Sequence, residues 1–222
     1  MAKFYSVAAV SCVCFIGAAE VPCKAQTLTT LANFNATNGA SPQSPLIQGT
    51  DGKFYGAASL GGAYGGGSIF VMTPAGALTT LYSFCSGNGC ADGSEPAGII
   101  QASDGNFYGM TPYLGANGGG TIFKVTPAGT LTTLHSFCTL PSCADGSVPL
   151  YGPIQASDGN LYGTTLIGGV YNNGTAFKIS LGGTLTTLYS FLPTDGQPSS
   201  GLVQGSDGNF YGETIGGGSL SE

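Results

Sequence analysis

The 222-residue chain contains no arginine, no tryptophan and a single histidine, His135. Only 7% of its residues are charged, compared with roughly 25% in typical soluble proteins. Its formal net charge is −6, and its few lysines form no basic cluster that could follow a phosphate backbone. The composition therefore argues against a nucleic-acid-binding protein.

The scarcity of histidine and tryptophan also narrows the catalytic options. With one histidine, a Ser–His–Asp triad or a histidine-based metal site would need a constellation that the chain does not display. The sialidase-type Asp box (S-x-D-x-G-x-x-W) is absent, because Asp and Gly are adjacent here and tryptophan is missing. We therefore predict no catalytic residue, no metal site and no cofactor.

Apolar runs are short, and the longest near the N-terminus, Val7–Ala19, is too short to span a bilayer. A lysine (Lys3) precedes this run, and a small residue, Ala25, ends the Cys23-Lys24-Ala25 segment that follows it; together these features resemble a secretory signal peptide. We predict residues 1–25 as this signal peptide, with cleavage after Ala19 as the alternative. The mature domain, 26–222, is then exported to the cell surface or secreted, with no membrane span.

What the chain has in abundance is repetition. One acidic, aromatic heptapeptide occurs four times, as TDGKFYG at 50–56, SDGNFYG at 103–109, SDGNLYG at 157–163 and SDGNFYG at 206–212. The phrase LTTL, starting at residues 28, 78, 131 and 185, keeps the same interval of about fifty residues. A period of this size indicates stacked or radially arranged repeats.

Each unit divides into four short apolar segments, which in the second unit are 98–102, 106–112, 121–126 and 130–137. Asp-Gly between the first two predicts a two-residue type I′ hairpin turn, with both residues at positive φ. Thr-Pro-Ala-Gly between the last two predicts a type I turn that ends on a left-handed glycine. The three-residue spacing of leucines in LTTL allows a β-bulge in the fourth strand.

Four antiparallel strands per repeat predict an all-β, propeller-like fold. The predicted parts are an N-terminal outer strand at 27–34, complete blades at about 45–84, 97–137 and 151–191, and a partial blade at 200–218. The partial blade lacks its third and fourth strands, so we expect an open or imperfectly closed ring. A fragment of a longer repeat protein and self-association through the free strand edges are two ways to satisfy those edges.

The repeated aspartates Asp51, Asp104, Asp158 and Asp207 are predicted to be structural turn residues and not catalytic acids. All seven aspartates of the chain precede a glycine, as turn residues do. In the strand that follows each turn, Phe107 and Tyr108 should point to opposite faces of the blade and contact different neighbouring blades.

The phrases SDGNFYG, IFKVTPAG and LTTLHSF closely resemble the tandem repeats called GloVer, found in exported "choice-of-anchor" bacterial proteins. The resemblance covers nearly all of residues 27–218. It implies a secreted repeat protein, often tethered by a C-terminal sorting segment, with no established biochemical activity. No such anchor is visible up to Glu222. A weaker similarity to quinoprotein-type and kelch-type blades supports the propeller fold by analogy.

Four cysteines form two C-x4-C loops at equivalent places in the first two full units, each within a twelve-residue connection. The third unit has a seven-residue connection and no cysteine there. In an exported protein this pattern predicts the local disulfides Cys85–Cys90 and Cys138–Cys143. A zinc site is the alternative, although no histidine accompanies the cysteines.

Three further sets of residues bear on chemistry. His135 stands where Tyr82 and Tyr189 stand in the other units, which indicates a ring-for-ring replacement. The inner strands carry glutamine where catalytic propellers carry acids. An extracellular polysaccharide-active hydrolase would need two catalytic acids. The candidates are the non-repeated Glu95 and Glu213, together with three aspartates expected on the face that carries the long loops, Asp92, Asp145 and Asp195.

Aromatic and amide side chains in the loops between second and third strands are the best binding candidates, because rings and amides suit sugar recognition. They are Tyr64, Tyr113, Asn117, Tyr171, Asn172 and Asn173. The alternative is that they are ordinary residues of glycine-rich loops. We predict an exported, non-catalytic binding or structural module whose partner is a carbohydrate or another surface protein; the hydrolase remains the alternative.

Overall fold

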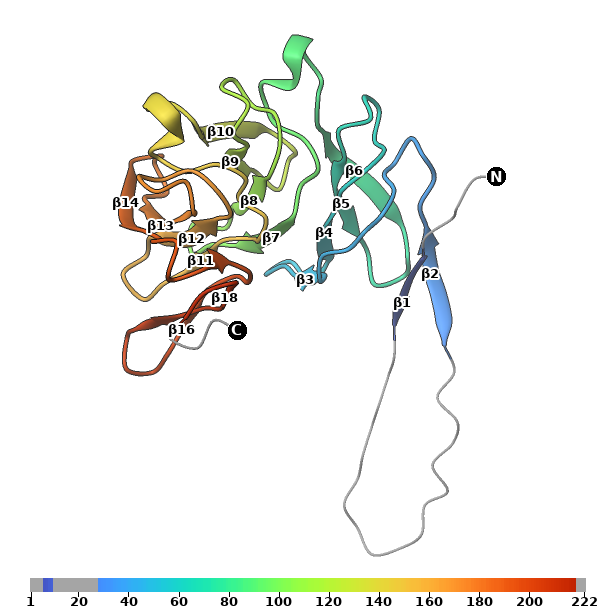
Figure 1. Ribbon diagram of the computed structural model, residues 1–222. Helices are drawn as coiled ribbons and strands as arrows, with labels where there is room; N and C mark the ends of the chain where they lie inside the picture. The colour runs from blue at the N-terminus through green and yellow to red at the C-terminus, as the bar shows by residue number, and fades with distance from the viewer. Residues whose placement is uncertain (1–5, 10–27, 219–222) are drawn as a thin grey trace, which may run out of the picture.

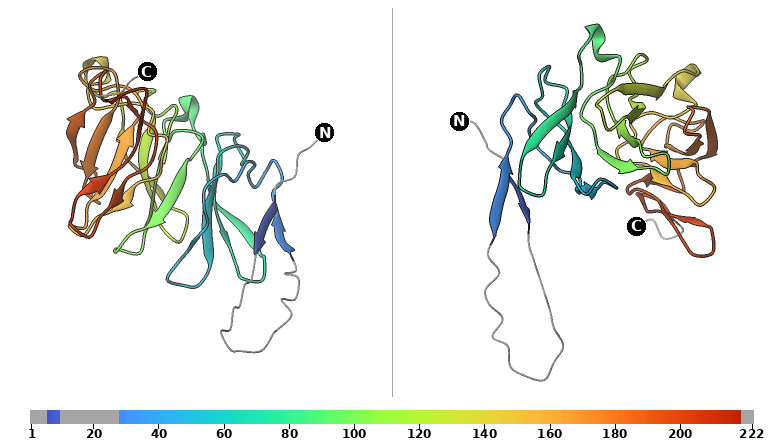
Figure 2. Two further views of the ribbon diagram at one scale, coloured as in Figure 1. Left: turned by 60° about the horizontal axis from the view of Figure 1, so that its bottom comes forward. Right: turned by 180° about the vertical axis from the view of Figure 1, so that it is seen from behind.

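The computed structural model describes residues 6–9 and 28–218. These residues form β-strands together with two single-turn 3-10 helices, η1 (Asn88–Cys90) and η2 (Pro141–Cys143). Three four-stranded antiparallel sheets stand side by side along an arc (Figures 1 and 2). The predicted all-β, propeller-like architecture of four-stranded blades is confirmed.

Each blade places its strands in chain order from the centre of the arc outward. Blade 1 contains β3 (Ile47–Gln48), β4 (Phe54–Ala58), β5 (Ser68–Met72) and β6 (Leu78–Ser83). Blade 2 contains β7 (Gly98–Gln101), β8 (Phe107–Thr111), β9 (Thr121–Val125) and β10 (Leu131–Ser136). Blade 3 contains β11 (Ile154–Gln155), β12 (Leu161–Thr165), β13 (Thr175–Ile179) and β14 (Leu185–Ser190).

The C-terminal part forms two short antiparallel strand pairs. β16 (Val203–Gln204) pairs with β17 (Phe210–Tyr211), and β15 (Gln197–Pro198) pairs with β18 (Thr214–Ile215). The fourth strand of every complete blade carries the expected bulge, seen in β10 as a register shift between Thr133 and His135.

At the other end of the arc, β2 (Thr29–Asn33) pairs with β1 (Ser6–Ala9). Of the predicted signal peptide, only β1 lies within the described residues; both proposed cleavage sites fall outside them. β2 acts as the outer strand of a preceding unit: the Leu31 carbonyl faces Gly76, as the Leu81 carbonyl faces Gly129 in the next interface. Within the described residues β2 makes no pairing with β17, so the arc is open (Figure 2).

The Asp-Gly hairpin differs from the predicted two-residue type I′ turn. Only Gly105 has positive φ (80°), and its N–H donates to the Ala102 carbonyl. The loop is thus the three-residue type, a turn followed by a left-handed glycine bulge, and Gly52, Gly159 and Gly208 repeat it. Asp104 does not adopt a left-handed backbone conformation. In the conformation that it does adopt, its carboxylate accepts the Asn106 backbone N–H at 3.1 Å.

The hydrophobic core lies between blades. Tyr55, Ile69 and Phe84 of blade 1 form one buried cluster with Phe107 and Phe123 of blade 2. An equivalent cluster joins Tyr108, Met110 and Phe137 of blade 2 to Leu161 and Phe177 of blade 3. Phe107 and its neighbour Tyr108 therefore contact different blades, as the alternation of a strand requires.

Two aromatic contacts recur at these interfaces. The ring of Tyr55 stacks on that of Phe107, and the ring of Tyr162 stacks on that of Phe210, each with centroids 4.1 Å apart. Deeper in the interface, Phe84 meets Phe123 edge-on at 5.1 Å. Gly109 makes room for this ring, because a Cβ there would lie 2.5 Å from Cζ of Phe123. Every blade interface thus depends on rings contributed by both partners.

The heptapeptide tyrosine offers a matched test of this packing. Tyr108 is fully buried between blades 2 and 3, whereas Tyr211, at the same repeat position, is 53% exposed. We expect Tyr108→Ala to lower the free energy of unfolding by about 3–5 kcal/mol, the range for removing a large buried ring. Tyr211→Ala should stay within about 0.5 kcal/mol of wild type. Urea unfolding of both variants checks this, and equal losses would contradict interface packing as the source of stability.

Candidate functional site

Each of the seven aspartates accepts a hydrogen bond from an aromatic side chain or lies within hydrogen-bond distance of one. On the short-turn face, Tyr108 Oη donates to Asp104 at 2.7 Å, four residues back in the same heptapeptide. The other three repeats make the same bond, at distances of 2.6–2.9 Å: Tyr55–Asp51, Tyr162–Asp158 and Tyr211–Asp207. The heptapeptide is therefore a self-contained structural unit that ties its turn to the strand it opens.

Ionisation follows from these bonds. Desolvation, together with the hydrogen bond to the Asp51 carboxylate and the charge of that carboxylate, raises the pKa of Tyr55 to about 12. Desolvation would raise the pKa of Asp104, but hydrogen bonds from Asn106 and Tyr108 outweigh it and the pKa is lowered. At neutral pH the turns hold a carboxylate and a protonated phenol, which is a stable pairing and not a poised acid–base pair.

On the long-loop face, the remaining three aspartates also contact an aromatic side chain through a hydrogen bond or at hydrogen-bond distance. Asp92 accepts from Tyr82 Oη at 2.8 Å, and Asp195 accepts from Tyr189 Oη at 2.7 Å. In the unit between them, His135 Nε2 lies 3.0 Å from Asp145. The histidine therefore occupies the place of the tyrosines and makes the same contact, as the sequence predicted.

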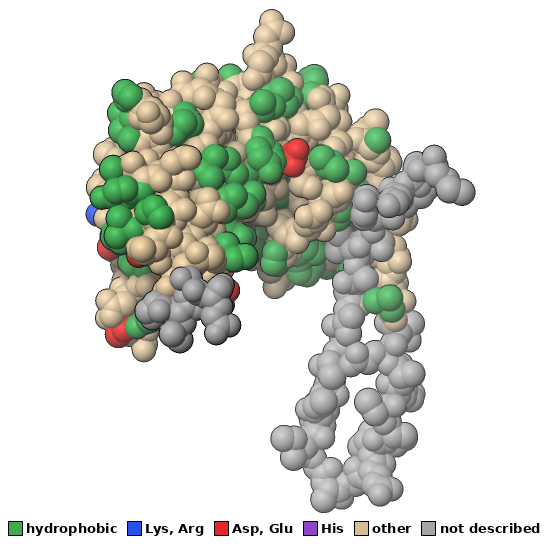
Figure 3. All heavy atoms as spheres, in the orientation of Figure 1, with side chains coloured by type: hydrophobic (Ala, Val, Ile, Leu, Met, Phe, Trp, Pro, Cys, Tyr) green, Lys and Arg blue, Asp and Glu red, His purple; other side chains and the backbone are tan. Residues whose placement is uncertain are grey.

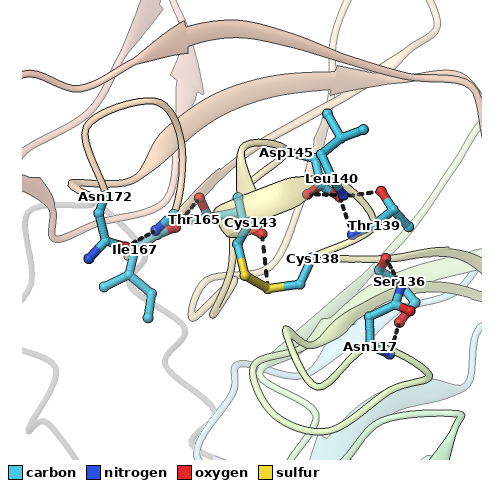
Figure 4. Close-up of a disulfide and its surroundings, with 12 residues drawn as sticks. Asn117, Ser136, Cys138, Thr139, Leu140, Cys143, Asp145, Thr165, Ile167 and Asn172 are labelled. Carbon is cyan, nitrogen blue, oxygen red and sulfur yellow. Dashed lines mark hydrogen bonds between the residues drawn. A yellow bond between two sulfur atoms is a disulfide. The ribbon is translucent and has the colours of Figure 1, made fainter.

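Asp145 also holds its loop together. It accepts the backbone N–H groups of Thr139 and Leu140 at 3.1 and 3.3 Å, and it turns toward both beside the disulfide (Figure 4). Desolvation opposes its ionisation, but these bonds, with the Thr139 hydroxyl and His135, lower the pKa of Asp145. Disulfides Cys85–Cys90 and Cys138–Cys143, both predicted, brace the loops of the first two units. The shorter third loop has no disulfide, and there Asp195 accepts the Leu192 N–H at 2.9 Å.

The inner-strand glutamines are structural as well. Gln155 Oε1 accepts the Ser103 backbone N–H of the preceding blade at 2.8 Å, while its Nε2 donates to the Gly159 carbonyl of its own turn at 2.9 Å. Gln101 and Gln204 make equivalent links. These amides fasten neighbouring turns to each other where a catalytic propeller would carry acids.

The predicted binding residues divide into two places. Tyr64, Asn117 and Tyr171 occupy equivalent tips of the loops between second and third strands, and both tyrosines are more than half exposed. The amides have backbone partners: Asn117 donates to the Ser136 carbonyl at 3.0 Å, and Asn173 donates to the Leu192 and Gly196 carbonyls. Asn172 accepts the Gly168 N–H at 3.2 Å. Their role in ligand binding stays a prediction, with these amide groups already engaged.

Tyr113 lies elsewhere, at the rim of an open pocket of about 440 Å³ on the long-loop side of the inner strands. Blades 1 and 2 and the start of blade 3 all contribute to it. Its lining is Gln43, Ser44, Ser59, Leu60, Glu95, Pro96, Ala97, Pro112, Tyr113 and Leu150. The Tyr113 carbonyl accepts the Ser94 N–H at 2.9 Å, which fixes the backbone of Tyr113 beside that of Glu95.

The pocket combines an aromatic ring with oxygen-bearing groups. Tyr113 is 43% exposed. The hydroxyls of Ser44 and Ser59 donate to the backbone carbonyls of Ala57 and Ser41, so their oxygens remain able to accept hydrogen bonds. Glu95 is the one acid among the lining residues, and neither ion pair of the described chain, Lys53–Asp51 or His135–Asp145, involves it. Charged side chains are also sparse over the face drawn in Figure 3.

Glu95 has a strained backbone, with φ of 59°. Ser41 and Val148, at the same point of the neighbouring blades, share this conformation, and all three precede a proline. The strain therefore belongs to the way the chain enters each blade. Only in blade 2 does this position hold a residue with a carboxylate. Neither the repeat pattern nor the spacing in the sequence could therefore have identified Glu95 as a pocket residue.

Over the described residues, no group of three or more His, Cys, Asp and Glu side chains is arranged to hold a metal ion. In the same part of the chain, no helix has the length and apolar character needed to cross a bilayer.

A family model described as the Gloeobacter/Verrucomicrobia repeat matches residues 19–149, which is more than half of the chain. The chain belongs to this repeat family. The match includes both disulfide loops and the first two complete blades. No curated protein sequence matches it significantly.

Solved structures similar to this chain support the propeller fold. A streptogramin B lyase structure matches with a TM-score of 0.53 and 22% identity, over 77% of this chain and 47% of that chain. A virginiamycin B lyase from Staphylococcus aureus matches with a TM-score of 0.50 and 16% identity, over 86% of this chain and 61% of the lyase. The chain thus spans about half to three-fifths of these proteins, and at such identities the likeness concerns fold alone.

The structural role of His135 can be tested by replacing it with tyrosine, the residue that stands at this position in the other two complete repeats. We expect His135→Tyr to leave stability nearly unchanged, because Tyr82 and Tyr189 make the same bond. His135→Ala should lower the free energy of unfolding by about 1–3 kcal/mol, since the carboxylate of Asp145 loses a buried partner. Denaturant unfolding measures both, and a His135→Tyr variant as unstable as His135→Ala would contradict the structural role.

The lowered pKa of Asp145 predicts that the stability of the protein depends on pH. Its pKa in the folded repeat protein is lowered, so its contribution to stability is present above the unfolded value of about 3.9 and is lost as pH falls through the folded value. Stability of the wild type should therefore fall below about pH 4, and Asp145→Asn should show a shallower decline. Urea unfolding between pH 2.5 and 7 checks this (~0.5-unit steps). Identical pH profiles would contradict the assignment.

Proposed function

We propose that this chain is an exported, non-catalytic binding module that takes a carbohydrate in the Tyr113 pocket. The observation that carries the proposal is the composition of this pocket: an exposed ring beside hydroxyl, amide and carboxylate oxygens, set on blades with fixed backbones. Sugars offer apolar C–H faces to rings and hydroxyls to oxygen and amide groups, so the chemistry of the pocket suits them.

Export is supported by the two disulfides, which persist in oxidising compartments, and by the signal-peptide features of residues 1–25. The repeat family adds support, since its recognised members are exported proteins. The low content of charged residues, 7% of the chain, agrees with a protein that contacts a neutral polymer.

A hydrolase acting on polysaccharide has less support from the same pocket. A glycosidase needs two carboxyl groups flanking the scissile bond. The pocket supplies Glu95, and each of Asp92, Asp145 and Asp195 is held by an aromatic partner and by backbone N–H groups of its own loop. The lyases of similar fold are too distant in sequence to extend their activity to this chain.

The test is polysaccharide binding by the intact protein and by two tyrosine variants. Pull-down with insoluble polysaccharides, followed by calorimetry with soluble fragments of the bound polymer, gives the ligand and its Kd. We expect Tyr113→Ala to weaken binding at least tenfold, about 1.4 kcal/mol, because it removes the exposed ring. Tyr171→Ala, also at an exposed loop position, is the matched control and should bind like wild type.

Two outcomes would contradict the proposal. Binding that survives Tyr113→Ala but is lost in Tyr171→Ala would move the site to the loop tips. Release of sugar fragments by the wild type, abolished by Glu95→Gln, would establish the hydrolase instead.

A further inference from the structure

The Tyr113 pocket holds one group that a neutral sugar would leave without a charged partner, the carboxylate of Glu95. The backbone N–H of Glu95 donates to the Gly66 carbonyl at 2.8 Å, which fixes the residue against the preceding blade. Its side chain is half-buried and forms no hydrogen bond or ion pair with the described residues. A partly desolvated carboxylate gains most from a ligand that brings a positive charge.

Glu95 and Tyr113 occupy a pair of positions that every complete blade has. At the entry to each blade, an isolated antiparallel bridge joins the entering chain to the residue two positions beyond the second strand: Ala40 to Leu60, Ser94 to Tyr113 and Ser147 to Ile167. The next residue along the entering chain has the same left-handed backbone in all three blades: Ser41 (φ 54°), Glu95 (φ 59°) and Val148 (φ 58°).

Of these three position pairs, the one in blade 2 alone combines a carboxylate with an aromatic ring. The blades therefore share one backbone arrangement, and blade 2 departs from the other two at both positions together. A carboxylate forms charge-assisted hydrogen bonds with an ammonium group, and the face of a tyrosine ring attracts a cation. The chemistry that both departures share is recognition of an amine.

The remaining polar groups of the pocket favour a ligand that donates hydrogen bonds. The hydroxyl of Ser44 donates to the Ala57 carbonyl at 3.4 Å, and that of Ser59 donates to the Ser41 carbonyl at 3.1 Å. Their hydrogens are thus engaged, and their oxygens face the pocket as acceptors, as the Glu95 carboxylate does. An ammonium group has three donors and no acceptor, so it matches such a lining.

Acidic sugars do not fit the same lining. None of the described residues around the pocket is basic, so a uronate or a sulfate would find no cation to pair with. Either anion would also be repelled by Glu95 and by a chain of net charge −6, which attracts cationic ligands instead.

We propose that the Tyr113 pocket selects a sugar unit with a free amine, which places its ammonium at Glu95 and its ring on Tyr113. This inference rests on the proposed carbohydrate-binding function and names the class of sugar. A partly N-acetylated polymer of glucosamine has the required chemistry. It is neutral at its acetylated units, in keeping with the low charge of the chain, and it carries an ammonium at the others.

The probes are three tetrasaccharides of the same β-1,4 linkage, built of glucosamine, N-acetylglucosamine or glucose. They differ at C2 of each ring, which carries an ammonium, an acetamide or a hydroxyl. Calorimetry is done at about pH 6, where free amines are protonated and carboxylates are ionised. We expect the wild type to bind the glucosamine tetramer at least tenfold more tightly than the other two. Raising the salt concentration from about 0.01 M to about 1 M should reduce this preference.

Two glutamine variants separate the role of Glu95 from net charge. Glu95→Gln keeps the shape of the side chain, and we expect it to bind the glucosamine tetramer no more tightly than wild type binds the glucose tetramer. Glu213→Gln removes the same charge at an exposed position outside the pocket, and it should bind all three tetramers like wild type. Thermal melting establishes that both variants are folded.

The outcomes distinguish this inference from the proposed function. Equal affinity for the three tetramers, or a preference for glucosamine that persists in Glu95→Gln, overturns the inference. No binding of the glucosamine tetramer does so too. In each case the proposed function stands if Tyr113→Ala abolishes binding of whichever sugar the wild type retains. A tetralysine peptide that binds as tightly as the glucosamine tetramer, and is lost in Glu95→Gln, overturns both, because the pocket would then recognise an amine without a sugar.

Discussion

Contacts between rings of neighbouring blades are the interaction on which the rest of this structure depends. A single four-stranded blade cannot bury its own apolar faces, so each blade is stabilised by packing against the next. Tyr55 stacks on Phe107 and Tyr162 stacks on Phe210, while a second layer of phenylalanines closes the interface below. The hydrogen bonds from Tyr55 to Asp51 and from Tyr162 to Asp158 hold these two rings in the orientation in which they stack on their neighbours.

The Tyr113 pocket is a consequence of this stacking. It exists where the entries to three successive blades converge, and its residues come from segments as far apart as Gln43 and Leu150. Because the acids and inner-strand glutamines are used to hold turns and loops, the polar chemistry left for a ligand is concentrated in this pocket. A binding role therefore fits the scaffold better than a reaction that needs paired acids.

Much of the fold could be predicted from the sequence because the same pattern of strands and turns occurs in each repeat. Strand positions, the bulge in the fourth strand, both disulfides and the place of His135 all follow from aligning the units with one another. The type of the Asp-Gly turn could not be predicted in this way. It depends on side-chain hydrogen bonds of the aspartate, which favour a three-residue loop over the shorter type I′ turn. The pocket was likewise out of reach, since Tyr113 and Tyr64 look alike in the sequence but face different surroundings.

Native-state hydrogen exchange measures most directly whether interfaces between blades are the source of stability. If they are, amides of β8, β9, β12 and β13, which lie in blades 2 and 3, should exchange slowest, and those of β16 and β17 should exchange fastest among the strands of the arc. The same ordering should hold although the heptapeptides of β8 and β17 are identical in sequence, SDGNFYG. Equal protection of these two strands would contradict the account, because it would mean that local sequence, and not contact with a neighbouring blade, sets stability.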